Sequence, residues 1–293
     1  MKSLKLYEIK KGKLVLETLK NYGVLNMRTL FELLPDYRNI RNLKRTVKNL
    51  CERKLIVKRY EQINGYKSVF YQINQTELAR KAVGHYLDTP AENLKQRQVS
   101  YKELFHEQTV IKLTHYLKTE HPQAIVLRDH ELINHPLAEN IISGLHSIEV
   151  IRPDVLFICY DQTKRKTVSV AIEYEKSLKS KSRIAQKLNF YTHRTRVDGV
   201  LYFYPESTID HNLRHIYFNK VIDRSLRIKN YGKHFLLTSR LTNDIKKSFN
   251  VLRNSTELSY SFKHWLDILT THSEYQRRND HFTNAPLSVA PGL

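Results

Sequence analysis

The stretch IRPDVLFICYDQTKRKTVSVAIEYEKS, residues 151–177, decides the fold. Two apolar segments flank a polar, lysine-rich break, which predicts a β-hairpin with residues 161–166 as its loop. Counting outward from that loop places Asp154 directly opposite Glu173. Directly opposed residues point to the same face of a sheet, with their Cβ atoms roughly 5 Å apart. The two acids are therefore expected to be neighbours at one end of the strand pair.

The second strand adds a third acid to this face. Alternation along a strand puts Glu175 on the face of Glu173, together with the small residues Ser169 and Ala171. Opposed carboxylates repel one another, so they are usually kept because a cation lies between them or because they face solvent. Carboxylate oxygens suit Mg²⁺ or Mn²⁺ better than zinc, and such an ion can activate water and neutralise charge on a phosphate. Asp154, Glu173 and Glu175 are thus candidate metal ligands, and an exposed sheet edge with acidic residues is the alternative.

The charge of the chain favours a polyanionic partner. Its 293 residues include 49 Lys and Arg against 29 Asp and Glu, a formal net charge of +20. This balance indicates nucleic acid, with an anionic membrane surface as the alternative. No apolar run approaches the ~18 residues that a membrane span needs, and the N-terminus lacks the apolar core of a signal peptide. Two cysteines cannot form a disulfide framework or a cysteine-based metal site, so a cytoplasmic location fits.

Residues 1–75 have the pattern of a winged-helix domain. Helices are predicted at residues 12–23 and 27–34, and a third, at residues 39–54, has one apolar stripe. Two β-rich runs around Asn64-Gly65 then predict a hairpin. In winged-helix proteins the third helix enters the major groove and the hairpin contacts phosphates, so double-stranded DNA is the expected partner; for any single basic residue, a solvated helix face is the alternative. The predicted stripe is Ile40, Leu43, Val47 and Leu50, and the candidate DNA-binding residues are Arg41, Lys44, Arg45, Lys48 and Lys67.

The rest of the chain predicts a linker and a second domain. Residues 76–97 are polar and contain Pro90, which indicates a helix followed by a linker. Residues 98–272 alternate helices with four or five short strands, which predicts a mixed α/β domain with a central mixed sheet flanked by helices. Residues 273–293 have no apolar period and are expected to be disordered. Besides the hairpin, strands are expected at about residues 124–127, 199–205 and 234–238, and helices at about 100–118, 180–196 and 210–225, with helical sequence up to 272.

The hairpin acids resemble a known motif. Pro153-Asp154 is followed, after 18 residues, by Glu173-Tyr-Glu175, which resembles the core of the PD-(D/E)XK nucleases with the restriction-endonuclease fold. The resemblance covers roughly residues 98–240 and implies that Asp154 and Glu173 bind a divalent ion. The sequence departs from the common form because Glu175 stands at the motif's lysine position, although an E-x-E version occurs in some active restriction enzymes.

Two further positions fit this resemblance. The helix after the core strand carries Gln186, Lys187 and Tyr191, and related nuclease sites point a lysine or glutamine of this helix at the scissile phosphate. Lys187 is therefore the candidate for the displaced lysine, with a solvated helix lysine as the alternative. Glu107 lies on the domain's first helix, from which this fold often supplies another acid to the metal; a capped or partly exposed glutamate is the alternative.

Domain order and motifs together also resemble the plasmid replication-relaxation group and the MobC-type mobilisation proteins, which are relaxases built on the nuclease fold. The resemblance implies a Mg²⁺- or Mn²⁺-dependent enzyme that nicks plasmid or mobile-element DNA, with accessory mobilisation proteins as further partners. No His-x-His triplet occurs among the 14 histidines, so the metal site of HUH relaxases has no counterpart. The nucleophile is either water or a tyrosine such as Tyr191. The alternatives are a non-catalytic plasmid replication or partition protein with an inactive nuclease fold, and a restriction endonuclease.

Overall fold

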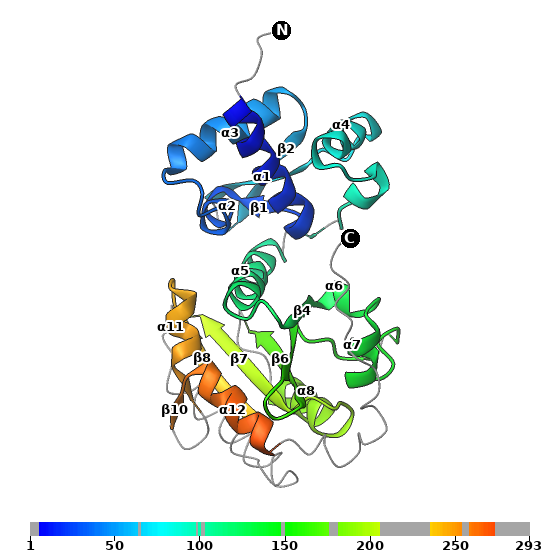
Figure 1. Cartoon of the computed structure of the whole chain (residues 1–293), viewed down its shortest axis with the longest axis vertical. Coiled ribbons are helices and arrows are strands. Elements are labelled where there is room, and N and C mark those ends of the chain that lie inside the picture. Colours follow the sequence, from blue (N-terminus) through cyan, green and yellow to red (C-terminus); the bar gives the residue numbers. More distant parts are fainter. Residues whose placement is uncertain are drawn as a thin grey trace. The chain divides into compact units, whose positions relative to one another are not determined.

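A computed structural model of the chain divides it into two compact units, Met1–Lys112 and Leu113–Leu293 (Figure 1). Among the described residues, no helix is long and apolar enough to cross a membrane. The residues that the structure describes are 6–63, 66–97, 99–100, 103–147, 150–175, 181–205, 235–253 and 258–272.

The first unit packs helices against a small antiparallel sheet. Asn26 and Asn39 start two of its helices, because their side-chain oxygens accept hydrogen bonds from the backbone N–H groups of Thr29 and Arg41 and so satisfy donors that a helix start leaves open. The strand order is β1-β3-β2. Three helices followed by a hairpin is the predicted order of elements. These elements are α1 (Leu6–Tyr22), β1 (Leu25–Asn26), α2 (Met27–Leu33), α3 (Ile40–Glu52), β2 (Ile56–Ile63) and β3 (Tyr66–Ile73).

Helix α3 is amphipathic, with one difference from the prediction. Leu43, Val47 and Leu50 are buried in the core of the first unit. Ile40, the first residue of the helix, is 37 % exposed and does not belong to the buried stripe. The strands that follow α3 pair up to Ile63 opposite Tyr66. This register leaves the expected two-residue connection at Asn64-Gly65, which itself lies outside the described residues.

The helix predicted within residues 76–97 is present, but the residues after it do not form a linker. Residues 76–97 form α4 (Glu77–Leu87) and the 3-10 helix η1 (Ala91–Leu94), both packed on the first unit. Gln96 beyond them donates a side-chain hydrogen bond to the backbone oxygen of Leu19. Most side chains of the segment are exposed or half-buried, which explains its polar composition. The residues that it contributes to the core are Val83, Leu87 and Leu94.

The boundary between the units also differs from the predicted one near residue 98, because it lies inside helix α5 (Leu104–Glu120). Gln108 on this helix is buried, and its side chain donates to the Val24 backbone oxygen at 2.7 Å and accepts from the Asn26 backbone nitrogen at 3.0 Å. Ile111 belongs to the core of the first unit. The N-terminal half of α5 is therefore part of that unit.

The described residues of the second unit contain a seven-stranded mixed sheet of order β10-β9-β8-β7-β6-β5-β4. The first three strands in the sequence are antiparallel, whereas β7 and β8 run parallel to β6. The prediction of a mixed sheet flanked by helices is thereby confirmed. The strands are β4 (Ile125–Arg128), β5 (Val155–Asp161), β6 (Lys166–Tyr174), β7 (Gly199–Pro205), β8 (Leu236–Leu241), β9 (Leu252–Arg253) and β10 (Ser259–Tyr260).

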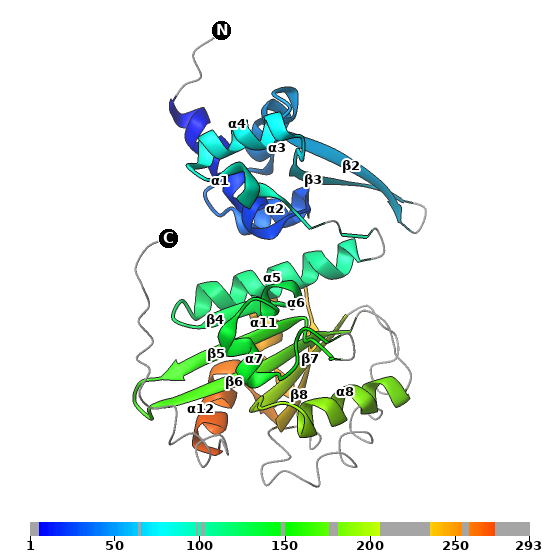
Figure 2. The same ribbon diagram turned by 90° about the vertical axis from the view of Figure 1, so that its right-hand side faces the viewer.

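Helices cover both faces of this sheet (Figure 2). Leu188 of α8 (Lys181–His193) packs with Leu156 and Ala171 on one face, where α7 (Pro136–Ile141) also contributes. Phe262 of α12 (Phe262–His272) packs on the other face, with its ring centre 5.3 Å from that of Phe157. The short helices α6 (Asp129–Leu132) and α11 (Ile245–Asn250) complete the described part of the unit.

Three sequence predictions for this unit need comment. The hairpin loop is shorter than expected, because Asp161 and Lys166 pair with each other. Residues 242–261, where helical sequence was expected, contain two short strands besides α11. The helix expected at 210–225 and the tail at 273–293 lie outside the described residues.

The packing of residues 76–97 predicts a contrast between two leucines. Leu94 is 1 % exposed, whereas Leu78 on α4 is 81 % exposed. Leu94→Ala should lower the free energy of unfolding of the first unit by about 2–4 kcal/mol, the usual cost of emptying a buried leucine site, and should make residues 88–98 sensitive to protease. Leu78→Ala is the control and should change neither. If protease cleaves the parent protein at residues 88–98 as fast as it cleaves Leu94→Ala, this segment is a linker after all.

Candidate functional site

The acids of the hairpin lie in the predicted register. Strands β5 and β6 pair antiparallel, with Val155 opposite Ile172. Asp154, one residue before β5, therefore comes opposite Glu173. Its carboxylate is held in place because Oδ2 accepts a hydrogen bond from the backbone N–H of Tyr174 at 2.7 Å.

These acids are not on an exposed sheet edge, so that alternative is wrong. Strand β6 lies inside the sheet between β5 and β7. Glu173 is 2 % exposed and Glu175 is 7 % exposed, whereas Asp154 is half-buried. Glu173 also has Tyr202 as its neighbour on the parallel strand β7. Sequence reasoning missed that tyrosine, although its place in the strand expected at 199–205 was a usable signal.

Two side chains of α8 bind the Glu173 carboxylate. Lys187 Nζ lies 2.7 Å from Oε2, and the Tyr191 hydroxyl donates to Oε1. The two residues are four positions apart and therefore share one face of the helix. Gln186 is exposed. Lys187 is thus brought to the acids as the sequence suggested, and its contact here is with the carboxylate.

In the described part of the site, three acids lie near one lysine. The pKa of the Glu173 carboxyl is raised to about 7, first because the group is buried and also because Asp154 is negative, although Lys187 opposes the shift. Burial by itself would lower the pKa of Lys187, but the attraction of Glu173, and then of Asp154 and Glu175, outweighs it and raises that pKa. Lys187 therefore keeps its charge, while burial and the charge of Asp154 make Glu173 harder to ionise than an ordinary glutamate.

Tyr191 is poorly suited to be a nucleophile. Its side chain is fully buried. Burial, and then the negative charge of Glu173, raises the pKa of its phenol well above the usual value. A neutral phenol that donates its proton toward an acid positions that acid and does not attack a phosphate.

The donor chemistry fits Mg²⁺ or Mn²⁺. Within the part of the chain that the structure describes, no group of three or more His, Cys, Asp and Glu side chains is arranged to hold a metal ion. Mg²⁺ is, however, commonly held by one or two protein carboxylates, with water and substrate phosphates completing its shell. Asp154 and Glu173 are such a pair. A divalent cation would neutralise the negative charge of the acids that Lys187 does not balance. Glu175, the third predicted ligand, is buried and adds its charge to the site.

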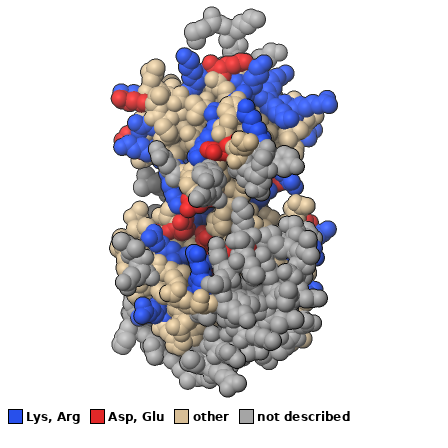
Figure 3. All heavy atoms as spheres, turned by 180° about the vertical axis from the view of Figure 1, so that it is seen from behind, with Lys and Arg blue, Asp and Glu red and all other residues tan. Residues whose placement is uncertain are grey.

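The remaining predicted site residues belong to the first unit. Glu107 is half-buried on the part of α5 that lies in that unit, outside the unit that contains the hairpin acids. Lys67 lies with its Nζ 4.6 Å from the ring centre of Tyr60, which is 55 % exposed on the neighbouring strand. Figure 3 shows many Lys and Arg side chains on the visible surface of the first unit, with Asp and Glu less frequent. The candidate DNA-binding residues of α3 are all exposed: Arg41, Lys44, Arg45 and Lys48.

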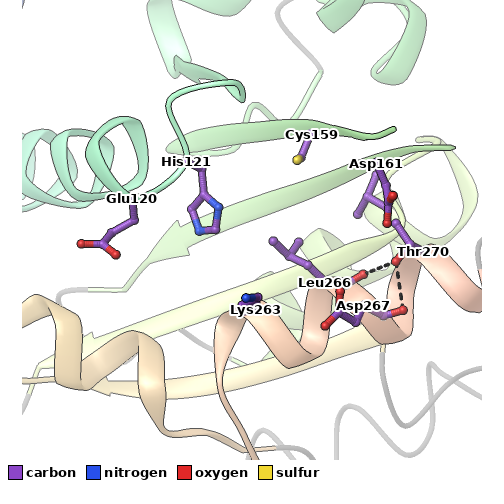
Figure 4. Close-up of a pocket in the computed structure, with 9 residues that line it drawn as sticks. Glu120, His121, Cys159, Asp161, Lys263, Leu266, Asp267 and Thr270 are labelled. Carbon is purple, nitrogen blue, oxygen red and sulfur yellow. Dashed lines mark hydrogen bonds between the residues drawn. The ribbon is translucent and has the colours of Figure 1, made fainter. Parts of the chain in front are cut away.

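A pocket of about 300 Å³ lies on the other face of the sheet (Figure 4). Cys159 and Asp161 line it from β5, opposite α12, and by alternation they point away from the face that carries Glu173. Burial, and then the charge of Asp161, raises the pKa of the Cys159 thiol, so this thiol is a weak nucleophile. The pocket is therefore separate from the acid site. It is lined by Glu120, His121, Cys159, Asp161, Val168, Lys263, Leu266, Asp267 and Thr270.

Comparison with known proteins gives no match: no family model, curated protein or solved structure is significantly similar to this chain. The site geometry and the sequence resemblance are therefore the basis for any functional assignment.

The buried pair of Lys187 and Glu173 predicts a clear effect on stability. Lys187→Met should lower the free energy of unfolding of the second unit by about 3 kcal/mol at pH 8, because it leaves a buried carboxylate without its partner. Trp265, the one tryptophan in the chain and fully buried in this unit, reports the transition by fluorescence. The control is Lys247→Met, whose exposed pair with Asp244 spans 3.9 Å and should contribute less than about 0.5 kcal/mol. Equal stability of the two variants would contradict a buried ion pair.

Proposed function

We propose that this protein is a divalent-metal-dependent DNA endonuclease that nicks one strand at a site in plasmid or mobile-element DNA. The observation that carries the proposal is the buried Glu173 carboxylate, with Asp154 opposite it on the next strand and Lys187 of α8 bound to it. A mixed sheet flanked by helices with acids at the end of its central strands is also what the resemblance to PD-(D/E)XK nucleases implies.

The first unit is proposed to be a winged-helix module that recognises double-stranded DNA. Its three helices precede a β-hairpin, and the third helix presents four exposed basic residues on the side away from its buried stripe. A helix of this kind fits the major groove, and a basic hairpin residue such as Lys67 fits the phosphate backbone. The surplus of positive charge strengthens binding to any DNA.

The second unit is proposed to carry the chemistry. A Mg²⁺ or Mn²⁺ ion held by Asp154 and Glu173 would supply activation of water and neutralisation of charge on the phosphate. Asp154 is oriented for this role by the backbone N–H of Tyr174, and Glu173 by the hydroxyl of Tyr191. Lys187 contributes a positive charge that is near enough to the acids to act on a bound phosphate.

The setting that we propose is mobilisation or replication of plasmids or mobile elements in the cytoplasm, with accessory mobilisation proteins as partners. It rests on the combination of a DNA-binding module with the acid motif, which resembles the MobC-type relaxases. A restriction endonuclease would use a similar site, and it would differ by cutting both strands at a short repeated sequence.

A non-catalytic DNA-binding protein is the second candidate, and two observations favour it. Lys187 already supplies a positive charge to Glu173, and Glu175 occupies the position at which the nuclease motif has lysine. A site whose acid is neutralised internally can persist as a structural remnant in a replication or partition protein.

The nuclease proposal predicts the behaviour of supercoiled plasmid that carries the native locus. Incubation with the protein and Mn²⁺ should convert it to nicked circles, as measured by agarose gel electrophoresis. Asp154→Asn and Glu173→Gln should each abolish nicking without loss of DNA binding, because they remove charge from the metal ligands. Asp267→Asn, which removes an exposed acid on α12, is the control and should nick normally.

Tyr191→Phe belongs in the same assay. It should nick at a rate within about tenfold of the parent protein, the factor that one hydrogen bond to a charged group is worth. Absence of nicking by the parent protein would favour the non-catalytic candidate. A covalent protein–DNA adduct that disappears with Tyr191→Phe would contradict water as the nucleophile.

The DNA-binding proposal predicts a change in salt dependence. Replacing Lys44, Arg45 and Lys48 together with alanine should weaken binding and reduce the slope of log K against log salt by up to about 3, since each lost phosphate contact removes about one released counterion. A charge-matched control replaces three exposed lysines elsewhere in the first unit, Lys20, Lys81 and Lys95. Equal weakening by both triple variants in fluorescence anisotropy titrations would show that α3 is not the recognition surface.

A further inference from the structure

The Glu173 carboxylate already binds a cation that belongs to the chain. Lys187 Nζ lies 2.7 Å from Oε2, with the lysine side chain 20 % exposed and the glutamate 2 % exposed. The distance is that of a charge-assisted hydrogen bond. A metal ion that binds Glu173 through this oxygen therefore competes with the ammonium for it.

The two oxygens of Glu173 differ in how easily their partners can leave. Oε1 accepts from Tyr191, whose rigid side chain is fully buried. Oε2 accepts from Lys187, which has a flexible four-carbon stem and keeps contact with solvent. A cation can therefore displace the partner of Oε2 more easily than the partner of Oε1. Tyr191 can stay in place and hold the carboxylate in its orientation.

The displaced ammonium would not lose all of its negative neighbours. Asp154 and Glu175 also attract Lys187 in this structure. A lysine that leaves Glu173 can thus remain beside the acids with its charge intact, in reach of a phosphate that approaches the same end of the sheet. An ion pair with a purely structural role would not need the two further acids, Asp154 and Glu175, beside the lysine.

We propose that Lys187 is a displaceable counter-cation: it neutralises Glu173 while no metal is bound, and a divalent ion exchanges with it at that carboxylate and so frees it for the phosphate of DNA. The inference rests on the proposed metal site at Asp154 and Glu173. It adds an order of events, because Lys187 becomes available to the phosphate only after the metal has entered. Tyr191 is a positioning residue in this scheme.

Competition between Lys187 and the metal predicts opposite effects on binding and on rate. Mn²⁺ binding to the full-length protein without DNA is measured by isothermal titration calorimetry, and nicking is measured separately on supercoiled plasmid. Lys187→Gln should bind Mn²⁺ roughly tenfold more tightly than the parent protein, the factor expected when a charged hydrogen bond no longer competes, and should nick more slowly. Glutamine keeps a donor for Glu173, which helps the variant to fold.

Two further variants separate competition from general electrostatics. Lys187→Arg keeps the positive charge and should leave Mn²⁺ affinity within about twofold of the parent value, because the competing ion pair is retained. Arg183→Gln removes one positive charge from an exposed position on the same helix and should also change the affinity by less than about twofold, because solvent screens it.

The outcomes distinguish this inference from the proposed function. Tighter Mn²⁺ binding by Lys187→Gln, with the affinities of Lys187→Arg and Arg183→Gln close to the parent value, supports the exchange. Unchanged or weaker Mn²⁺ binding by Lys187→Gln overturns the exchange even if the parent protein nicks DNA. Absence of nicking by the parent protein, together with tighter Mn²⁺ binding by Lys187→Gln, overturns the endonuclease proposal and leaves the exchange standing.

Discussion

The pairing of β5 with β6 is the constraint on which the rest of the site depends. Its register sets Asp154 opposite Glu173, and a shift by one residue would turn the acids to opposite faces of the sheet. Because β6 lies inside the sheet, Glu173 is buried and needs a positive partner. Lys187 of helix α8 is that partner. Every chemical role that we propose for the second unit depends on this one buried carboxylate.

The two units divide the proposed work between recognition and chemistry. The basic residues of α3 are exposed because Leu43, Val47 and Leu50 anchor the other side of the helix, and we propose that these basic residues bind DNA. In the second unit, Glu173 is buried and Asp154 half-buried, and they are held by hydrogen bonds from Tyr191 and the Tyr174 backbone respectively. In this proposal, attraction to DNA would come from exposed surface charges, and binding of a cation would come from acids that are fixed by hydrogen bonds.

Local sequence patterns predicted much of the fold and of the acid site. The features that they missed depend on packing between residues far apart in the sequence. Alternation and a polar break were enough to pair Asp154 with Glu173, and the resemblance to the nuclease motif pointed to Lys187. The pattern could not show that Leu94 is buried, or that Gln108 ties half of α5 to the first unit through two backbone groups. Such contacts join residues far apart in the sequence. The pocket beside Cys159 was missed for the same reason, since α12 and β5 form it together.

Crystals of the protein grown with Mn²⁺ would test the central claim most directly, through the anomalous signal of the ion. The account predicts a peak within coordination distance of Asp154 and Glu173, roughly 2.0–2.3 Å, with the Lys187 ammonium no longer bound to Glu173. No peak at these acids, with Lys187 still on Glu173 at a Mn²⁺ concentration that saturates binding elsewhere, would contradict it. The lysine would then be a permanent partner of the acid, and the site would not hold a metal.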